Sequence, residues 1–328
     1  MQAVVWTNYG PPGVLQLQEV EKPAPRDDEV LIRVHAATVT AGDCEARAFA
    51  FPPLFWLPLR LYMGATRPRI KVLGQELAGE VEATGAAVTR FKPGDKVLAA
   101  TLMRFGAYAE YACLPETYVV RKPAAMTYEE AATIPTGGVN ALHFLRKADV
   151  QPGERVLING AGGSIGTYAV QIAKALGAEV TCVDSAGKLD MLRSLGADHV
   201  IDYTREDFTA SGETYDAIID VVGKSPFSRS VRSLRPNGRY VLGILSLAGV
   251  ARGLWTSITT DKQVVSEPAG YRPEDYAFLS ELIEAGEVRA VIDRRFPLEQ
   301  VPQAHAYVEQ GHKAGNVVIS VSKDEDTR

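Results

Sequence analysis

The chain has 328 residues, more than one hydrophobic core commonly holds, so two domains are expected. Hydrophobic residues make up 46% and charged residues 23% of the sequence, proportions that exclude a disordered or fibrous chain. The net charge of −5 argues against a nucleic-acid partner, since phosphate binding needs clustered Lys and Arg.

No transmembrane segment is predicted. The longest apolar stretch, residues 49–63, contains three prolines and Arg60, and it falls short of the roughly 20 apolar residues that a spanning helix needs. We therefore expect no membrane partner. The first residues lack a basic region followed by an apolar run, so a cytoplasmic location is expected. Cys44, Cys113 and Cys182 are far apart and form no CxxC pair, which favours reduced thiols over a structural zinc site.

Up to about residue 122 the sequence is typical of an irregular β module. Short runs rich in Val, Leu and Ile predict strands at residues 3–6, 29–36, 77–84 and 96–99. Clusters of Gly and Pro separate these runs, as at residues 10–13.

After Tyr128, short apolar runs alternate with helical patterns. Strands are predicted at residues 155–159, 179–183, 199–202, 217–222 and 239–244. Apolar residues recur at helical spacing between Ile165 and Leu176, which predicts a crossover helix that ends at Gly177. This β-α-β alternation indicates a doubly wound parallel sheet. A further helix is predicted near residues 276–283 and a last strand at residues 316–320.

The most informative segment is the glycine-rich turn between the first of these strands and its helix. Gly160 and Gly163 allow a tight turn and a close backbone approach, and Gly166 lets the helix pack against the strand. The helix N-terminus then presents free N–H groups to a pyrophosphate. The turn predicts dinucleotide binding by Gly160, Gly162, Gly163, Ser164, Ile165 and Gly166.

The end of the second strand bears on which nicotinamide cofactor is bound. Asp184 lies where an acid binds the ribose 2′-hydroxyl of NAD and repels the 2′-phosphate of NADP. Ser185 and Lys188 supply a hydroxyl and a cation that suit a 2′-phosphate. Alternatively, Asp184 or Ser185 caps the following helix and Lys188 is a solvated surface charge.

Several motifs together resemble the medium-chain dehydrogenase/reductase superfamily, in its quinone oxidoreductase branch. They are the glycine-rich turn and residues 173–178, 195–203, 220–223, 10–15, 73–79, 94–97, 106–111 and 311–318. The resemblance implies an α/β protein with a GroES-like β-barrel catalytic domain at residues 1–124 and 268–328. A Rossmann domain with a doubly wound parallel sheet is implied at residues 125–267. The resemblance also implies an active site in the cleft and a homodimer formed through the edge of the Rossmann sheet.

The positions that hold catalytic zinc in alcohol dehydrogenases of this superfamily correspond here to Thr40, Gln75 and Thr136. Hydroxyl and amide groups are poor zinc ligands, and the four-cysteine structural zinc lobe is also missing, so no metal is expected. The resemblance then implies a zinc-independent reductase that passes hydride from NADPH, or alternatively NADH, to a quinone or an α,β-unsaturated carbonyl. Asn316 stands at a cofactor-binding position where lysine is often found.

The resemblance also suggests the residues near the nicotinamide and the adenosine. The catalytic candidates, whose polar groups can hydrogen-bond a carboxamide or an acceptor oxygen, are Thr40, Asp43 and Gln75. Further cofactor-binding candidates are Thr136, Tyr203, Gly243 and Ile244. Asp43 is alternatively a structural turn acid, Thr136 a helix cap and Tyr203 a sheet-packing residue. Glu76 is expected to be structural.

An aromatic segment is predicted to form the mouth of the substrate site. Its prolines, as at Pro58, suggest a loop or lid, and a flat hydrophobic acceptor needs such a wall. The pocket candidates are Phe49, Phe55, Trp56, Tyr62 and, from a later segment, Trp255. The alternative is that these aromatic residues belong to the core or to a subunit contact.

The leading functional hypothesis is therefore a metal-free NADPH-dependent reductase acting on a small hydrophobic acceptor. One alternative is an NAD(P)-linked alcohol dehydrogenase, although the missing zinc ligands would deprive it of a Lewis acid. The other is an NADPH-binding sensor or interaction protein with little turnover.

Overall fold

The computed structural model describes residues 1–322, with all their side chains except those of residues 53 and 54. Two compact units are present: unit 1 is Met1–Thr136 with Ala290–Arg328, and unit 2 is Gly137–Arg289. These boundaries come later in the chain than the predicted ones after residues 124 and 267. Helix α3 (Tyr128–Ala131) packs against strands of unit 1, and helix α9 (Pro273–Glu284) packs against α4 (Val139–Lys147) of unit 2. The first boundary therefore falls after α3, which the sequence prediction placed in the Rossmann domain. The second falls after α9, which the prediction placed in the GroES-like domain.

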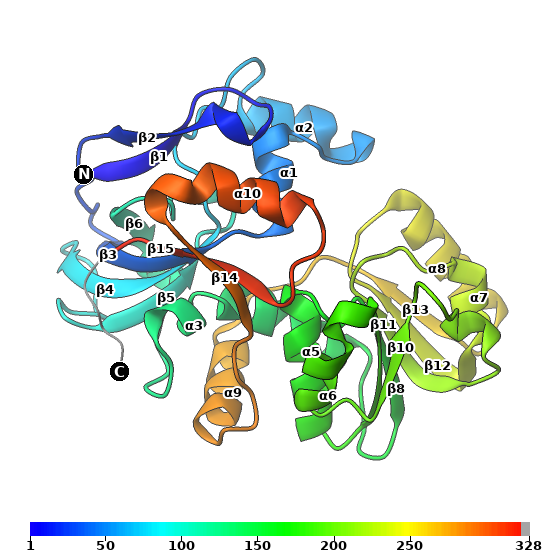
Figure 1. Cartoon of the computed structure of the whole chain (residues 1–328). Helices are drawn as coiled ribbons and strands as arrows, with labels where there is room; N and C mark the ends of the chain where they lie inside the picture. Colours follow the sequence, from blue (N-terminus) through cyan, green and yellow to red (C-terminus); the bar gives the residue numbers. More distant parts are fainter. Residues whose placement is uncertain (323–328) are drawn as a thin grey trace. The chain divides into compact units, whose positions relative to one another are not determined.

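Unit 1 is built on a seven-stranded sheet in the order β14-β15-β3-β4-β5-β7, with β6 paired to β3 (Figure 1). Its strands are β3 (Glu29–Thr38), β4 (Glu76–Thr84), β5 (Lys96–Ala100), β6 (Tyr111–Pro115), β7 (Val119–Arg121), β14 (Ile292–Pro297) and β15 (Asn316–Ser320). A separate antiparallel pair consists of β1 (Gln2–Trp6) and β2 (Leu15–Glu19). The longer helices of the unit are α1 (Ala41–Ala48), α2 (Pro53–Met63) and α10 (Val301–Glu309). Single turns are η1 (Pro12–Val14), η2 (Leu102–Arg104), η3 (Glu116–Tyr118) and η7 (Leu298–Gln300).

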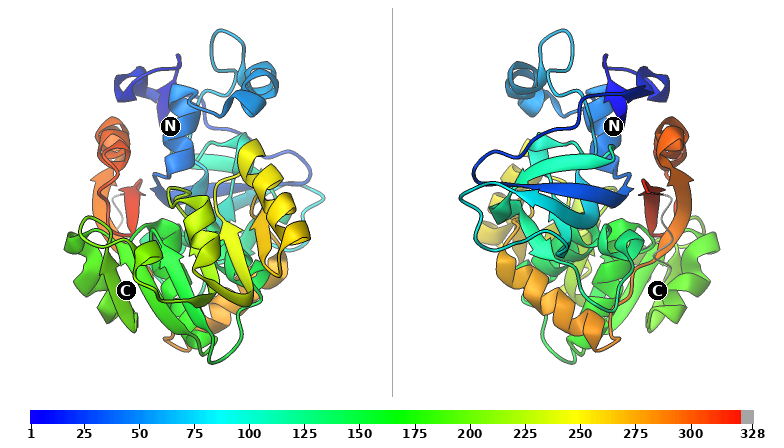
Figure 2. Two further views of the ribbon diagram at one scale, coloured as in Figure 1. Left: turned by 90° about the vertical axis from the view of Figure 1, so that its right-hand side faces the viewer. Right: turned by 90° about the vertical axis from the view of Figure 1, so that its left-hand side faces the viewer.

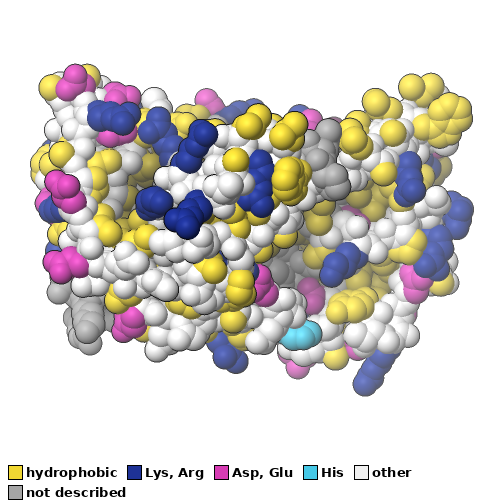
Figure 3. Space-filling model, turned by 90° about the horizontal axis from the view of Figure 1, so that it is seen from above, with side chains coloured by type: hydrophobic (Ala, Val, Ile, Leu, Met, Phe, Trp, Pro, Cys, Tyr) yellow, Lys and Arg dark blue, Asp and Glu magenta, His cyan; other side chains and the backbone are white. Residues whose placement is uncertain are grey.

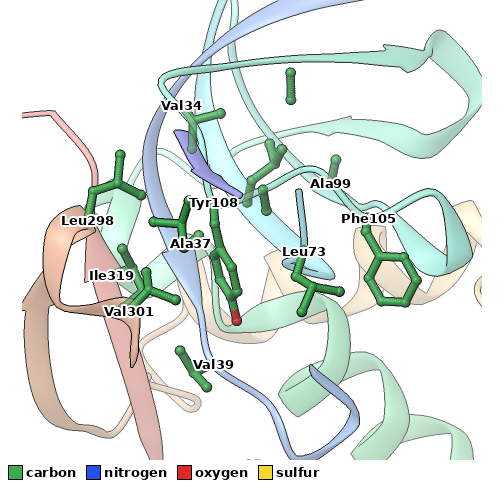
Figure 4. Packing of buried hydrophobic residues seen from close by; sticks show 14 of the residues in the cluster. Val34, Ala37, Val39, Leu73, Ala99, Phe105, Tyr108, Leu298, Val301 and Ile319 are labelled. Atoms are coloured by element: carbon green, nitrogen blue, oxygen red, sulfur yellow. The ribbon is translucent and has the colours of Figure 1, made fainter. Parts of the chain in front are cut away.

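The last part of the chain completes the core of unit 1. It is coloured orange to red in Figure 2, and its strand β15 pairs antiparallel with β3. Figure 4 shows Leu298, Val301 and Ile319 in one apolar cluster with Ala37 and Tyr108. The last segment and the first part of the chain therefore share one hydrophobic core.

Unit 2 is a doubly wound parallel sheet in the order β10-β9-β8-β11-β12-β13. The strands are β8 (Arg155–Asn159), β9 (Glu179–Asp184), β10 (His199–Asp202), β11 (Tyr215–Asp220), β12 (Leu234–Leu242) and β13 (Gln263–Ser266). Helices α5 (Ser164–Ala175) and α6 (Leu189–Ser194) lie on one side of the sheet, and α7 (Phe227–Arg232) and α8 (Leu247–Thr259) on the other (Figure 1). The short turns η5 (Ala186–Lys188) and η6 (Phe208–Ala210) complete the unit. Strand order reverses between β8 and β11, which is where such sheets bind ligands.

The prediction of a proline-broken loop in the aromatic segment is wrong, because residues 53–63 form helix α2. Pro52 and Pro53 stand at the N-cap and first helical positions, where a missing N–H costs nothing. Only Pro58 lies inside the helix. None of the described helices is both long and apolar enough to cross a membrane.

Candidate active site

The glycine-rich turn connects β8 to α5 at the carboxyl edge of the parallel sheet. Gly160 has a φ of 83°, and a Cβ there would lie 2.6 Å from Val222 Cγ1, so only glycine suits the position. A Cβ on Gly166 would lie 2.4 Å from the Gly160 carbonyl oxygen, so the helix and turn approach closely. Gly163 is the N-cap of α5 and provides no side-chain cap. The first-turn N–H groups of Ser164, Ile165 and Gly166 therefore form an electropositive end that suits a phosphate.

Asp184 is the last residue of β9, and its carboxylate faces the glycine turn. Its Oδ2 accepts a hydrogen bond from the Gly162 N–H at 2.7 Å, and its Oδ1 accepts one from the Ser185 N–H at 2.8 Å. The Lys188 ammonium lies 3.1 Å from Asp184 Oδ1. The Lys188 side chain is 12% exposed and the Asp184 side chain 8% exposed. Lys188 is thus not a solvated surface charge. Ser185 occupies the N-cap of η5 without a side-chain cap bond, so the capping alternative also fails.

The other cofactor candidates of unit 2 lie at the same edge of the sheet. Tyr203 follows β10, is 62% exposed and donates its N–H to the Asp184 carbonyl, so it is not packed into the sheet. Gly243 follows β12 and donates its N–H to the Asp220 carbonyl at 2.9 Å. Ile244, the next residue, is 50% exposed.

Asp220 organises this edge and was missed as a site residue. Its fully buried carboxylate accepts hydrogen bonds from Asn159 Nδ2 at 2.9 Å, the Gly223 N–H at 2.8 Å and the Tyr240 hydroxyl at 3.0 Å. Ser225 also donates its hydroxyl to this carboxylate. The acid ties the ends of β8, β11 and β12 together. The sequence signal that could have found Asp220 is an acid at the end of an apolar strand. Its role was not evident, because partners such as Asn159 and Tyr240 are distant in the sequence.

In unit 1, the three catalytic candidates lie together at the start of α1. Thr40 is the N-cap: its Oγ1 accepts the Asp43 N–H at 3.1 Å, while the Asp43 carboxylate accepts the Thr40 N–H at 2.9 Å. The Thr40 hydroxyl lies 2.7 Å from Asp43 Oδ2 and 3.3 Å from Gln75 Oε1. Burial raises the pKa of Asp43 to about 6, although hydrogen bonds from Thr40 oppose the shift. Asp43 is therefore the structural acid of a capping box, whatever further role it has.

Glu76 is a second buried carboxylate of unit 1. Its Oε1 accepts the Thr136 N–H at 2.6 Å and its Oε2 accepts the Thr38 hydroxyl at 2.5 Å. Burial raises the pKa of Glu76 to about 7, with a further contribution from the charge of Asp43. Thr136 itself lies in a π-helical turn (Ile134–Gly138, η4), and the N-cap of α4 is Gly138, so Thr136 is not the predicted helix cap.

The side chains at the positions of catalytic zinc do not fit that metal. The Thr40 hydroxyl and the Gln75 amide are weak donors for zinc, and the hydroxyl is bound to Asp43. Among residues 1–322, no group of three or more His, Cys, Asp or Glu side chains could hold a metal ion. Asn316 is buried, and its amide donates to the Val291 carbonyl at 3.0 Å.

The predicted pocket residues differ in exposure and come from both units. Phe49 is 6% exposed and belongs to the core of unit 1, as the alternative interpretation has it. Phe55 is half-buried on α2, where Trp56 and Tyr62 are 47% and 51% exposed. Trp255 is 71% exposed on α8 of unit 2.

Comparisons with known proteins agree with this architecture. A model of the alcohol dehydrogenase GroES-like domain matches residues 26–124, and a model described as zinc-binding dehydrogenase matches residues 195–319. A chloroplast envelope quinone oxidoreductase homolog of Arabidopsis thaliana is 30% identical over 97% of this chain and 98% of its own. A chloroplastic NADPH-dependent alkenal/one oxidoreductase of the same plant is 30% identical over 97% of this chain and 79% of its own. The solved quinone oxidoreductase of Coxiella burnetii superposes with a TM-score of 0.88 and 30% identity, covering 98% of this chain and 99% of that one.

Proposed function

Because the chain belongs to the medium-chain dehydrogenase/reductase superfamily, in its quinone oxidoreductase-like branch, we propose that it is a zinc-independent NAD(P)H-dependent reductase of quinones or α,β-unsaturated carbonyls. The observation that carries this proposal is the uncapped N-terminus of α5 behind the turn from Gly160 to Gly166. That end fits a pyrophosphate, since its N–H groups and helix dipole both favour a negative charge.

In this proposal, the remaining residues at the carboxyl edge of unit 2 contact different parts of the dinucleotide. Asp184, Ser185 and Lys188 take the adenosine ribose and its substituent, with Tyr203 beside the adenosine. Gly243 and Ile244 complete the proposed cofactor contacts of unit 2. Thr136 and Asn316 of unit 1 are proposed on the sequence resemblance alone, because the Thr136 N–H is bound to Glu76 and the Asn316 amide to the Val291 carbonyl. When bound, the nicotinamide supplies a hydride, and the protein supplies orientation and exclusion of water. NADPH is the proposed donor, with NADH as the alternative.

For the acceptor we propose the cluster of Thr40, Asp43 and Gln75. A hydride added to an electron-poor carbon leaves negative charge on the acceptor oxygen, which needs a hydrogen-bond donor or a proton. The Gln75 amide can donate to such an oxygen, and the Thr40 hydroxyl can do so when Asp43 is protonated and no longer accepts its proton. Asp43, 2.7 Å behind the Thr40 hydroxyl, orients it. No metal takes part in this scheme, and the half-buried Phe55 of α2 provides an apolar wall for a flat acceptor.

A steady-state assay tests the proposal. Chelator-treated protein is mixed with NADPH, or NADH in parallel, and an ortho-quinone or an enone, and loss of nicotinamide absorbance is followed. Turnover that survives the chelator supports metal-free reduction. A folded protein that binds nucleotide but oxidises neither cofactor with either class of acceptor would falsify the proposal. The predicted homodimer and cytoplasmic location are separate proposals, of which light scattering tests the first.

A further inference from the structure

The segment around α2 has an unusual charge pattern for this chain. Between Glu45 and Glu76 there is no Asp or Glu, whereas the segment holds five cations, although the net charge of the protein is −5. These cations are Arg47, Arg60, Arg67, Arg69 and Lys71. The segment is therefore a local cationic region on an acidic protein.

The only charged residue of α2 is turned toward aromatic rings. The Arg60 guanidinium lies 3.9 Å from the ring centre of the buried Phe49 and 4.3 Å from that of Tyr9. Such stacking holds the charge by cation–π attraction. The Tyr9 hydroxyl also donates to the Gly64 carbonyl at 2.8 Å, which anchors the end of the helix. Because Arg60 is on the inner side, the outer side of α2 carries no charge.

The outer side is instead apolar and exposed. We define the α2 face as Leu57, Pro58, Leu61 and Tyr62. Leu57 and Leu61 are 63% and 61% exposed, and Tyr62 is 51% exposed. Trp56, at the edge of the face, is 47% exposed. Neighbouring apolar side chains exposed to this degree mark an interaction site more often than isolated ones do.

Three cations follow this face directly. The Arg69 N–H donates to the Met63 carbonyl at 2.8 Å, so the turn that carries Arg67 and Arg69 is tied to the end of α2. Arg67, Arg69 and Lys71 are exposed, and none is paired with an acidic side chain in the part of the chain that the structure describes. Figure 3 shows the molecule from above, with yellow and dark blue side chains together in the centre of the view and little magenta among them.

We propose that the α2 face and the cations Arg67, Arg69 and Lys71 dock this protein on the surface of an anionic lipid bilayer. Apolar side chains that enter the headgroup boundary and cations that meet anionic lipids are the two sources of peripheral membrane binding. Trp and Tyr suit that boundary, because each joins an apolar ring to a polar group. No spanning helix is needed, so the prediction of no membrane partner is revised only for peripheral contact. An acidic protein surface is the alternative occupant, and it predicts no binding to vesicles.

Sedimentation with vesicles of phosphatidylcholine, alone or mixed with phosphatidylserine, tests the proposal. The protein is expected to bind the mixed vesicles and to be released by salt, which screens the charges. Arg67→Gln with Arg69→Gln is expected to weaken binding about 25-fold, since each cation contributes about fivefold. Leu57→Gln with Leu61→Gln is expected to weaken it about tenfold.

A matched control lies on α8, where Leu247 and Leu254 are also 63% and 61% exposed. Leu247→Gln with Leu254→Gln is expected to leave vesicle binding unchanged. A second readout uses bromine-labelled lipid, which should quench the fluorescence of Trp56 but not that of Trp255, as single Trp→Phe variants at each position show. Equal thermal melts verify that the variants fold, and NAD(P)H oxidation by a water-soluble quinone should be unchanged in the Leu57, Leu61, Arg67 and Arg69 variants.

Three results overturn the proposal: no binding to mixed vesicles, equal binding to pure phosphatidylcholine, or loss of binding in the α8 pair but not in the α2 pair. None of these results depends on whether the protein reduces quinones.

Discussion

Replacement of Lys188 by Met is the sharpest test of how unit 2 reads the ribose of its cofactor. A Cβ at Gly162 would lie 2.4 Å from Lys188 Cδ, so the stem of the lysine packs on the glycine turn. Methionine keeps an unbranched stem of similar length and removes only the ammonium. Asp184, 3.1 Å away, then loses its counter-charge but keeps the N–H groups of Gly162 and Ser185.

The expected effect is on NADPH alone. A charge-assisted bond from the ammonium to a 2′-phosphate contributes about 1.5–3 kcal/mol, but Lys188 must partly leave Asp184 to form it. A net loss of about 1.4 kcal/mol, a tenfold rise in Kd, is therefore expected for NADPH. NADH has no 2′-phosphate, so its Kd should change by less than about twofold.

The Kd values of both nucleotides are measured by calorimetry, together with those of 2′,5′-ADP and 5′-ADP. Lys174→Met is the matched control, because it removes an ammonium that pairs with Asp198 at 2.7 Å elsewhere in unit 2. An equal loss of affinity for both nucleotides, or none for either, would refute the assignment of Lys188 to the 2′ position.

Three further predictions concern single positions of the two units. Gly160→Ala should lower the free energy of unfolding by about 2 kcal/mol and abolish nucleotide binding; Gly153→Ala, with a similar φ of 81° but open space for a Cβ, isolates backbone strain. Thr40→Val should lower the free energy of unfolding by about 1 kcal/mol, because the helix cap is lost, and should also lower kcat. Thr40→Ser should restore both values. Thr127→Val removes the equivalent cap of α3 and should leave kcat unchanged. Glu76→Gln should raise the melting temperature at pH 8 and leave it unchanged near pH 4, because a pKa raised from 4.5 to about 7 means that stability is lost as pH rises through this range. Ionisation of Glu76 should lower the free energy of unfolding by about 3 kcal/mol in full. If the melting temperatures of the wild type and of Glu76→Gln still differ near pH 4, ionisation of Glu76 is not the cause.

Local patterns made unit 2 predictable from the sequence. The strand, turn and helix from Arg155 to Ala175 are continuous in the chain, so their spacing and glycines specify them directly. Strands β8, β9 and β10 were found close to the predicted residues, whereas β11 and β12 begin earlier and β13 was not predicted. Strand β13 is a four-residue edge strand, and such short segments give too few positions for a clear period.

Features that depend on distant partners were missed. The sequence left two interpretations of Lys188, a surface charge or a phosphate ligand. Its burial against Asp184 depends on how η5 packs against the glycine-rich turn, which the sequence does not indicate. Helix α2 was mistaken for a loop, because prolines at the start of a helix and prolines in a loop look alike until the helix has a surface to pack on. Arg60, which holds that helix through rings from other segments, gives no local signal.

Thr40 shows that the structural and the functional interpretations of one residue need not exclude each other. A threonine hydroxyl has one proton and two lone pairs, and here one lone pair accepts the Asp43 N–H while the proton faces Asp43 Oδ2. If Asp43 is ionised, that proton is held by the carboxylate and is withheld from an acceptor oxygen. If Asp43 is protonated, it can donate to Thr40 Oγ1, which frees the threonine proton for the acceptor. Because burial raises the pKa of Asp43 to about 6, the second arrangement predominates only below about pH 6, and about a tenth of the molecules adopt it at pH 7. The same burial and capping box that stabilise the start of α1 thus allow Thr40 to donate to an acceptor in the proposed reaction increasingly as the pH falls toward 6.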